Sequence, residues 1–354
     1  MNYWVSVVFR AIPLAMMVVC LGYGVDIWST TADASSSVAG PVVTFLAAIC
    51  LCLFATAATI IRQLIGRFTR TDAVLYPTLG YTLAAGTVAY GLALLWGSSS
   101  TRPHTDHYVA GHVVFGLGLI SGCVATVATA STKFSLIPQN SVRPEGDRQP
   151  PSGAFRPGAF VAMATAPVVL ALVAWVFAIT NLVLPATSAR FTAGHVLAGI
   201  AMVCTALIGL VLSILRQVQN SYEPRERLVW PWLVIALGSL ALVWGVVLLI
   251  LDRESYYRTP GLVVIGLGLV CFSILSKIGL LALVWRRTFA LANRVPLVPI
   301  VTALSCLFLA AFVFEAAVAD PSVYIAARVL VGLGAVCFTL YSIVSILESG
   351  TSSG

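Results

Sequence analysis

The chain has 354 residues, of which 59% are hydrophobic and only 9% are charged, and its mean hydropathy is +0.98. A soluble domain carries roughly 25% charged residues, so this composition excludes a water-soluble globule and indicates an integral membrane protein. The formal net charge of +7 needs no nucleic acid partner, because membrane proteins hold excess Lys and Arg in their cytoplasmic loops.

Ten apolar segments are each long enough to span a membrane. A helix needs about 20 apolar residues to cross a hydrocarbon core of roughly 30 Å. The first segment has no small-residue cleavage site after a short apolar core, so we expect a true span there and not a removed signal peptide. We predict an all-α fold with ten transmembrane helices at residues 4–28, 38–62, 73–97, 108–133, 158–184, 192–216, 229–251, 260–285, 295–318 and 323–347.

The even-numbered segments begin with versions of one motif. A small residue precedes the position that histidine occupies in two copies, and the five pairs are Gly40-Pro41, Gly111-His112, Gly194-His195, Gly261-Leu262 and Ala327-Arg328. Positions are numbered below from this histidine position, as +0. Four copies carry a cysteine at +9, which supports the register: Cys50, Cys204, Cys271 and Cys337.

The odd-numbered segments share a different mark, a proline near the beginning. These prolines are Pro13, Pro77, Pro167, Pro231 and Pro296 or Pro299. Proline is tolerated in a first helical turn, where its missing N–H would have no partner, so we expect these residues there. The alternation predicts five two-helix repeats in a single transmembrane domain spanning 1–354, at about 4–62, 73–133, 158–216, 229–285 and 295–347.

Each repeat contains two spans, so all five copies are parallel in the membrane. This excludes the inverted repeats of many secondary transporters and favours a closed ring with pseudo-five-fold symmetry, since an open arc would leave two unlike ends. Position +4 and positions +6 and +9 hold mainly Gly, Ala and Cys, and they lie on opposed flanks of a helix. Small residues let helices approach closely in lipid. We therefore predict that the even helices form an inner ring, with the odd helices outside.

A face between those flanks carries small, weakly polar residues toward its cytoplasmic half. The candidate lumen-lining residues on it are Thr126, Thr129, Ser276, Ser342 and Ser345. The outer half of the same face is apolar, like a constriction that gates by dewetting. Ordinary packing of small residues explains the same pattern, and it is the interpretation that we prefer.

Positive charge predicts the orientation of the chain. With the N-terminus in the cytoplasm, thirteen Lys and Arg residues fall at the inner ends of the spans and in the inner loops, against five outside, with Arg10 and Lys277 left aside as lying within spans. The excess places both termini in the cytoplasm. The one sizeable loop, 135–157, is rich in Pro and charged residues, and we expect a flexible cytoplasmic linker there.

All four histidines, His104, His107, His112 and His195, are predicted on the outer side. The unperturbed pKa of histidine, about 6.5, makes these residues candidate pH sensors. The alternative, which we favour, is that His112 and His195 are passive, hydrogen-bonded interface residues. His104, His107, His112 and Asp106 match no strict ligand spacing, so we expect no metal site.

Ionisable residues within spans are costly and often mark pathways. Lys277 is the deepest cation, and it is predicted either to snorkel to the inner interface or to serve transport. Glu315 and Arg328 lie near the outer end of the last hairpin, where an ion pair between them is plausible. For all three residues, structural pairing and a transport function remain equal alternatives.

Recognisable enzyme motifs are missing from the sequence. It contains no H-E-x-x-H, no G-x-S-x-G and no P-loop. We therefore expect neither an enzyme nor a cofactor. The expected partners are the lipid bilayer and an unidentified small solute or ion, and we expect a monomer because five repeats already complete a ring.

The repeated Ala-Gly-His motif, the run from Ile274 to Arg287 and the ending from Arg328 to Phe338 resemble the YhiM-like family of bacterial inner membrane proteins. The resemblance covers nearly the whole chain, and residues 135–157 are the least alike. It implies an association with acid or osmotic stress, and it supplies no catalytic or binding residue. It also favours the pH-sensing hypothesis for His112 and His195.

These observations lead to two functional hypotheses. The first is a channel- or transporter-like stress protein in which protonation of the outer histidines biases an axial path. The alternative is a non-conducting sensor or scaffold whose axis is plugged. The width of the axis discriminates between them, because an apolar plug over its full length favours the second.

Overall fold

The computed structural model describes residues 3–30, 34–99, 105–137, 150–184, 187–251, 257–286, 295–318, 320 and 323–351. These residues form ten α-helices and a short 3-10 helix, η1, and contain no strand. The elements are α1 (Tyr3–Thr30), α2 (Ala34–Leu64), α3 (Arg70–Ser99), α4 (Thr105–Ser131), η1 (Phe134–Leu136), α5 (Pro157–Val183), α6 (Ser188–Val218), α7 (Glu226–Ile250), α8 (Arg258–Arg286), α9 (Leu297–Ala316) and α10 (Tyr324–Thr351).

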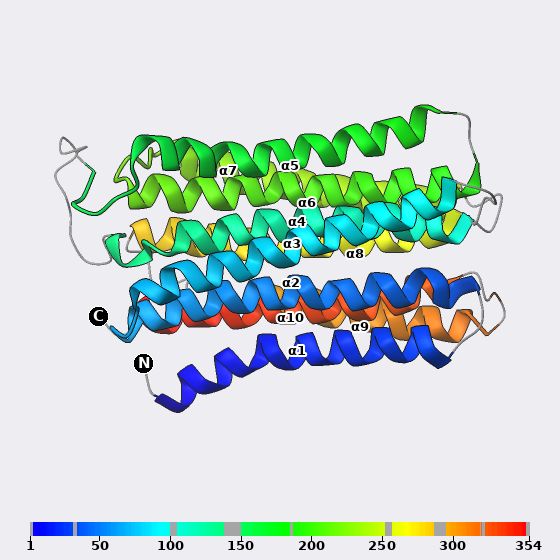
Figure 1. Ribbon diagram of the computed structural model, residues 1–354, viewed down its shortest axis with the longest axis horizontal. Helices are drawn as coiled ribbons and strands as arrows, with labels where there is room; N and C mark the ends of the chain where they lie inside the picture. The colour runs from blue at the N-terminus through cyan, green and yellow to red at the C-terminus, as the bar shows by residue number, and fades with distance from the viewer. Residues whose placement is uncertain are drawn as a thin grey trace.

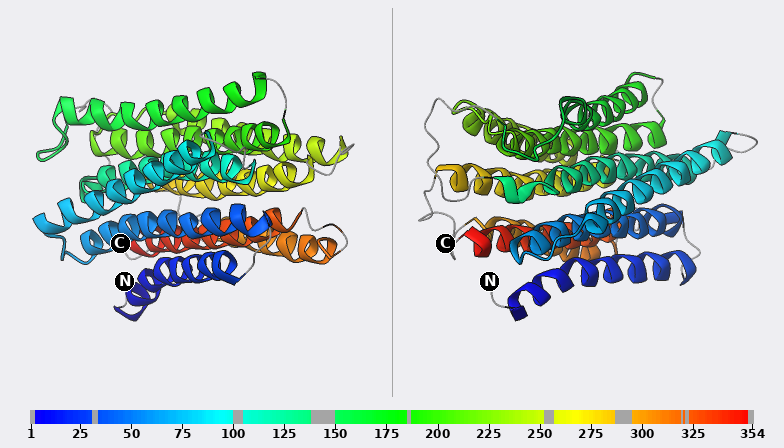
Figure 2. Two further views of the ribbon diagram at one scale, coloured as in Figure 1. Left: turned by 45° about the vertical axis from the view of Figure 1, so that its right-hand side comes forward. Right: turned by 60° about the vertical axis from the view of Figure 1, so that its left-hand side comes forward.

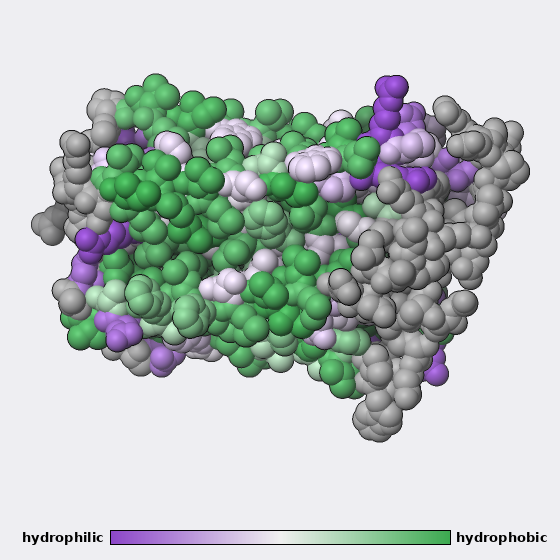
Figure 3. All heavy atoms as spheres, turned by 180° about the vertical axis from the view of Figure 1, so that it is seen from behind, coloured by the Kyte–Doolittle hydropathy of each residue, from purple (hydrophilic) through white to green (hydrophobic). Residues whose placement is uncertain are grey.

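The ten helices run side by side along one direction (Figure 1). All ten are long and apolar enough to cross a membrane, and hydrophobic residues form a broad belt between more polar ends (Figure 3). Both chain termini lie at the same end of the bundle, which we call the terminal end, and every even-numbered helix begins at the opposite, far end (Figure 1).

The even-numbered helices form the interior of the bundle. Contacts between them join α2 to α4, α4 to α6, α6 to α8, α8 to α10 and α10 back to α2. Each odd-numbered helix pairs with the even helix that follows it and also contacts an even helix of the neighbouring hairpin. Between 72% and 94% of the residues in the even spans are buried, against 17% to 33% in the odd spans. The odd helices therefore cover the even ones, as the turned views in Figure 2 also show.

The glycine at +4 explains how neighbouring even helices approach each other. A Cβ added to Gly116 would lie 2.8 Å from Cδ1 of Ile200 on α6, and one added to Gly199 would lie 2.7 Å from Cδ1 of Leu267 on α8. Gly266 faces Leu333 and Gly332 faces Leu46 in the same way. Each of these Leu and Ile side chains occupies +5 of the next helix. Close packing of this kind holds helices together in lipid.

The glycine at +6 faces the outer partner and not a second even helix, which corrects our expectation for that flank. A Cβ on Gly118 would lie 2.8 Å from the backbone N of Val88 on α3. Gly268 similarly faces α7, and Gly334 faces α9. The helices of a hairpin also approach closely at Gly91 of α3, where a Cβ would lie 2.5 Å from the backbone N of Phe115, and at Gly24 of α1, where it would lie still closer to Oγ1 of Thr44.

Four of the prolines that we expected in first turns lie inside the odd helices instead: Pro13, Pro77, Pro167 and Pro231. Proline is tolerated inside membrane helices because neighbouring groups satisfy the freed carbonyl. In α9 the expectation is met, since Pro296 is the N-cap residue.

The described parts of the loop between α4 and α5 are packed against the bundle, although we expected a flexible linker over 135–157. Phe134 and Ile137 are each 3% exposed. The backbone N of Ser135 donates to Oε1 of Gln63 at 2.8 Å, and Nε2 of Gln219 donates to the carbonyl O of Phe155 at 2.9 Å. Residues 138–149 of the predicted linker lie outside the described residues.

Candidate functional site

A cavity of about 260 Å³ lies at the far end, between all five even helices. Its walls include +1 of every copy, and valine occupies this position each time: Val42, Val113, Val196, Val263 and Val329. One turn nearer the far end, −3 contributes Val38, Val109, Thr192, Thr259 and Ile325. A volume of this size holds many water molecules. The far end of the bundle axis is therefore a vestibule.

The axis narrows abruptly beyond the vestibule. The next cavity is about 20 Å³ and is also lined by all five even helices. Its walls repeat +8 and +12, which are all apolar: Ile49, Ile120, Val203, Val270, Val336, Leu53, Val124, Leu207, Ile274 and Leu340. A water molecule needs roughly 10–15 Å³. This volume holds about one water molecule, so the axis is constricted here, and apart from Lys277 its walls are apolar.

A third cavity, of about 10 Å³, lies toward the terminal end. It shares Val127, Leu210 and Lys277 with the middle cavity, so the two are adjacent. Two hydroxyl-bearing residues, Thr56 and Ser131, join Lys277 in this wall. The terminal half of the axis therefore differs chemically from its middle.

Lys277 is 2% exposed and lines both of the narrow cavities. It occupies +15 of α8, where the other copies hold Thr56, Val127, Leu210 and Ile343. The described part of the chain offers its amino group no ion pair and no hydrogen bond, and no carboxylate lines either cavity. Lys277 therefore faces the axis of the bundle and not its lipid-facing surface.

The terminal end of the axis is covered by η1. Phe134 lines the last cavity, and Gln63 of α2 ties the segment in place by donating from Nε2 to the carbonyl O of Ser131 at 2.6 Å and accepting from Ser135. The hydroxyl of Ser131, by contrast, is buried without a hydrogen-bond partner. Phe134, from the segment that follows the second hairpin, thus forms a lid over the axis.

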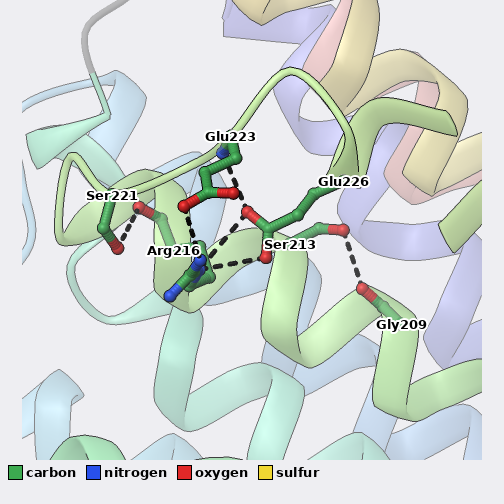
Figure 4. A network of polar contacts seen from close by, with 6 residues as sticks. All are labelled: Gly209, Ser213, Arg216, Ser221, Glu223 and Glu226. Atoms are coloured by element: carbon green, nitrogen blue, oxygen red, sulfur yellow. Dashed lines mark hydrogen bonds and ion pairs between the residues drawn. The ribbon is translucent and has the colours of Figure 1, made fainter. Parts of the chain in front are cut away.

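Two ion-paired turns hold the terminal end together. Nε of Arg216 donates to Oε1 of Glu226 at 3.0 Å, and Glu226 also accepts from the backbone N of Glu223 at 2.8 Å (Figure 4). At the same positions of the first repeat, Arg62 pairs with Asp72. Asp72 also accepts from the backbone N and the hydroxyl of Thr69, as a helix-capping residue. Each turn therefore joins an even helix to the odd helix that follows.

His112 and His195 lie between helices and outside the walls of the axial cavities. Nδ1 of His112 lies 2.9 Å from the carbonyl O of Tyr108, and Nδ1 of His195 lies 2.8 Å from that of Phe191. Because a carbonyl only accepts, both Nδ1 atoms carry the proton. His195 stacks on Trp244 of α7 with 5.8 Å between ring centroids, and His112 packs on Phe177 of α5. His107 is half-buried at the start of α4, and His104 lies outside the described residues.

The five predicted lumen-lining residues face the outer helices or their own helix. The hydroxyl of Tyr81 on α3 lies 3.2 Å from Oγ1 of Thr126 and 3.4 Å from that of Thr129. Ser342 donates to the carbonyl O of Phe9 on α1, and Ser276 donates to the carbonyl O of Ser273 in α8. Ser345 is 5% exposed and, like the other four, does not line the three axial cavities. Helix packing, the preferred interpretation of this face, matches these contacts.

The expected pairing of Glu315 with Arg328 is replaced by other contacts. Nη1 of Arg328 donates to Oγ of Ser35 on α2 at 3.0 Å, and its guanidinium lies 5.4 Å from the ring centroid of Tyr324. Glu315 is exposed on α9. Arg328 occupies +0 of α10, which faces the next even helix and not α9. The ion pair at this end joins Arg258 to Asp320 at 3.2 Å.

The face of the even helices that lines the axial cavities was not predicted from the sequence. Positions −3, +1, +8, +12, +15 and +19 line the cavities. These positions follow a helical spacing, and five valines at +1 were a signal visible in the sequence. The candidate lumen-lining residues were instead small and weakly polar, because a hydrated lumen favours such side chains. Ser131 and Phe134 had no sequence signal of their own.

Within the described residues, no group of three or more His, Cys, Asp or Glu side chains is arranged to hold a metal ion. The eight cysteines are free and buried. The histidines, the thiols and the carboxylates thus supply no ligand cluster within that part of the chain.

Comparison with known proteins gives a family without an assigned function. The family model described as "Protein of unknown function (DUF2776)" matches residues 1–352. Inner membrane protein YhiM of Escherichia coli strain K12 is 43% identical over 352 residues, which cover 99% of each chain. No solved structure matches the chain significantly.

Proposed function

The chain belongs to the DUF2776 family and is a homologue of Inner membrane protein YhiM, and from this premise we propose that it is a channel- or transporter-like protein of the inner membrane. Its path runs along the axis of the even helices, and the structure corresponds to a closed state. The proposal includes a monomer without enzymatic activity that passes a small solute or ion under acid or osmotic stress.

The architecture that we propose is a pseudo-five-fold ring of five parallel two-helix repeats. Two observations support it. Equivalent positions of all five copies meet around the same cavities, as the five valines at +1 do. The +4 glycine also meets the +5 side chain of the next even helix at four interfaces. A ring of parallel repeats creates an axis, and an axis is where a path through the membrane can form.

Lys277 is the observation that favours a conducting path over a plugged axis. A plug is most stable when it is apolar, whereas a Lys near the centre of a membrane helix costs about 3 kcal/mol on insertion scales. Lys277 is buried on the axis with no counter-charge among the described residues. Burying the charge of Lys277 costs stability, and passage of a polar solute or an ion along the axis gives a reason for keeping it there.

We propose that the terminal end is cytoplasmic. The Arg62, Arg216 and Lys133 side chains occupy equivalent +21 positions there, and the larger share of the chain's Lys and Arg residues belongs to the same end. In this orientation the vestibule opens to the outside, and the η1 lid faces the cytoplasm.

Gating by histidine is the finer part of the proposal. His112 and His195 each rest on an aromatic ring of the odd helix in the next hairpin. An added proton on Nε2 changes this contact, because an imidazolium is attracted to an aromatic face and needs a second acceptor. Protonation would therefore move odd helices against even ones, and it would act on the path from outside the axis.

The alternative is a non-conducting sensor or scaffold. The closed middle of the axis, with about 20 Å³ between ten apolar side chains, favours it. In this reading the vestibule is a binding surface with no continuation through the membrane.

The test is flux of ions and small solutes in proteoliposomes at external pH from about 4.5 to 7.5, a range that spans the ordinary pKa of histidine. We expect flux that rises in acid and loses this dependence when His112→Gln and His195→Gln are combined. His107→Gln is the matched control and keeps the dependence. The absence of flux at every pH would contradict the channel and favour the sensor or scaffold. Flux with the same pH dependence in the double variant would contradict gating by the two histidines.

A further inference from the structure

Three polar side chains from three even helices meet at the terminal half of the axis. Thr56 of α2, Ser131 of α4 and Lys277 of α8 line one cavity. Their residues are 1%, 0% and 2% exposed. Groups buried to this degree lose their hydration and need partners within the protein or from a ligand.

Two of the three have hydrogen-bond donors to spare. The Ser131 hydroxyl has no partner, and its backbone carbonyl is already taken by Gln63. The Lys277 amino group has no hydrogen bond or ion pair within the described residues. Thr56 donates to the carbonyl O of Cys52 at 3.2 Å, so its proton is used. The cavity therefore presents unused donors.

Among the described residues, the charge at this cavity is only positive. A protonated lysine brings a positive charge, and no described Asp or Glu lines this cavity or the adjacent one. An ammonium group and a hydroxyl proton together recognise an anion. Rings or single residues of Lys and Arg are the usual source of anion selectivity in pores.

The size of the cavity limits which anion fits. The two adjacent cavities measure about 20 Å³ and about 10 Å³, and one water molecule needs roughly 10–15 Å³. Carboxylates of metabolites and phosphate esters are several times larger. A single monatomic ion without its hydration shell matches the space.

We propose that Lys277 and Ser131 form a binding site for chloride, or a halide of similar size, on the axis of the bundle. The ion supplies the missing counter-charge of Lys277 and accepts from the Ser131 hydroxyl, and the Phe134 lid closes the site toward the terminal end. The route by which the ion reaches the site depends on the proposed axial path, whereas the binding of chloride at the site does not depend on it.

The first experiment measures binding without flux. Line broadening of the ³⁵Cl resonance is recorded with purified protein in detergent, as chloride is exchanged for gluconate. We expect saturable broadening in the unaltered protein, a loss of at least about tenfold in Lys277→Gln and a smaller loss in Ser131→Ala. Lys133→Gln is the matched control, because Lys133 is a half-buried lysine near the same end that lines none of the three cavities. Broadening that is absent, or that persists in Lys277→Gln, overturns the proposal.

A second measurement protects against misfolded variants. A bound ligand raises the thermal stability of the folded state, so chloride should raise the melting temperature of the unaltered protein and of Lys133→Gln. Lys277→Met removes the charge and keeps the length of the side chain, and we expect it to fold and to lose the chloride effect. A chloride effect retained in Lys277→Met also overturns the proposal.

Flux separates this inference from the proposed function. Chloride binding without flux in proteoliposomes would support the chloride site and contradict the conducting path. Cation flux without chloride binding would support the conducting path and contradict the chloride site. Chloride flux that depends on Lys277 supports both.

Discussion

The two ends of the axis are lined by the same five even helices and yet differ in width and chemistry. At the far end, equivalent valines of all five copies surround about 260 Å³. At the terminal end, the last cavity is about 10 Å³, and Lys277, Ser131 and Phe134 line it. The turns there are also joined by ion pairs with a buried carboxylate, whereas the far end has an exposed pair. Residues at equivalent positions of the even helices form the wide far end, whereas Lys277, Ser131 and Phe134, whose residue types do not recur at the equivalent positions, narrow the terminal end.

The comparison predicts a large difference in accessibility. Thr192→Cys places a thiol in the vestibule, and Leu207→Cys places one in the closed middle of the axis. With a charged, membrane-impermeant thiol reagent added at the far-end side, we expect Thr192→Cys to react about 100-fold faster or more, because the thiolate must be exposed to react. The eight native cysteines are buried, so the background is low. Similar rates at the two positions would contradict a closed middle.

Opening the apolar middle should change flux more than altering the vestibule. Leu207→Ser introduces a hydroxyl into the 20 Å³ cavity, and a constriction that gates by dewetting opens when it becomes polar. We expect flux in proteoliposomes to rise by about tenfold or more. Val113→Ser makes a comparable change in the wide vestibule, and we expect it to stay within about twofold of the unaltered protein. Equal effects would place the barrier elsewhere.

The lid at the terminal end should have a smaller effect of its own. Phe134→Ala removes the aromatic side chain from the last cavity and leaves the apolar middle in place, so we expect flux to rise by only a few-fold. Leu136→Ala lies in the same 3-10 helix, does not line the cavity, and serves as the control. Flux through Phe134→Ala that matches the control would show that η1 does not limit passage.

The ion pairs at the two ends should differ in their contribution to stability. Asp72 is 2% exposed, caps α3 and pairs with Arg62. Asp72→Asn should lower the free energy of unfolding by about 2 kcal/mol, since it removes both a cap and a buried charge pair. Asp320→Asn removes an exposed pair whose Arg258 side chain is 48% exposed, and such pairs contribute about 0–1 kcal/mol. Thermal melting in detergent measures both, and equal losses would contradict this ranking.

The membrane class and the helices follow from composition and length, and the structure gives ten apolar helices as the sequence predicted. Their ends were harder to place. We expected Pro13, Pro77, Pro167 and Pro231 in first turns, and they lie inside helices, because neighbouring groups in a membrane bundle can satisfy the backbone carbonyl that proline frees.

The side chains that line the axis could be predicted only in part. Lys277 was noticed because charge is rare within a span. Thr126 and Ser342 are polar enough to line a lumen, but their hydroxyls bond to Tyr81 and Phe9 of outer helices, in line with the packing interpretation preferred from the sequence. Successive residues of a helix are rotated by about 100° around its axis, so adjacent positions in the sequence belong to different faces. The pattern of small residues by itself does not say which of these faces meets a neighbouring helix.

The sequence by itself determined that this protein is an integral membrane protein with ten apolar helices, and that one motif recurs at the start of every second helix. These properties are local, because hydropathy and helical spacing are carried by neighbouring residues. Only the tertiary structure decided that the valine face, and not the hydroxyl face, looks inward, and that Lys277 and Ser131, from helices far apart in the chain, share one cavity. The rotation of each helix is set by the residues that it packs against, and those residues come from other helices.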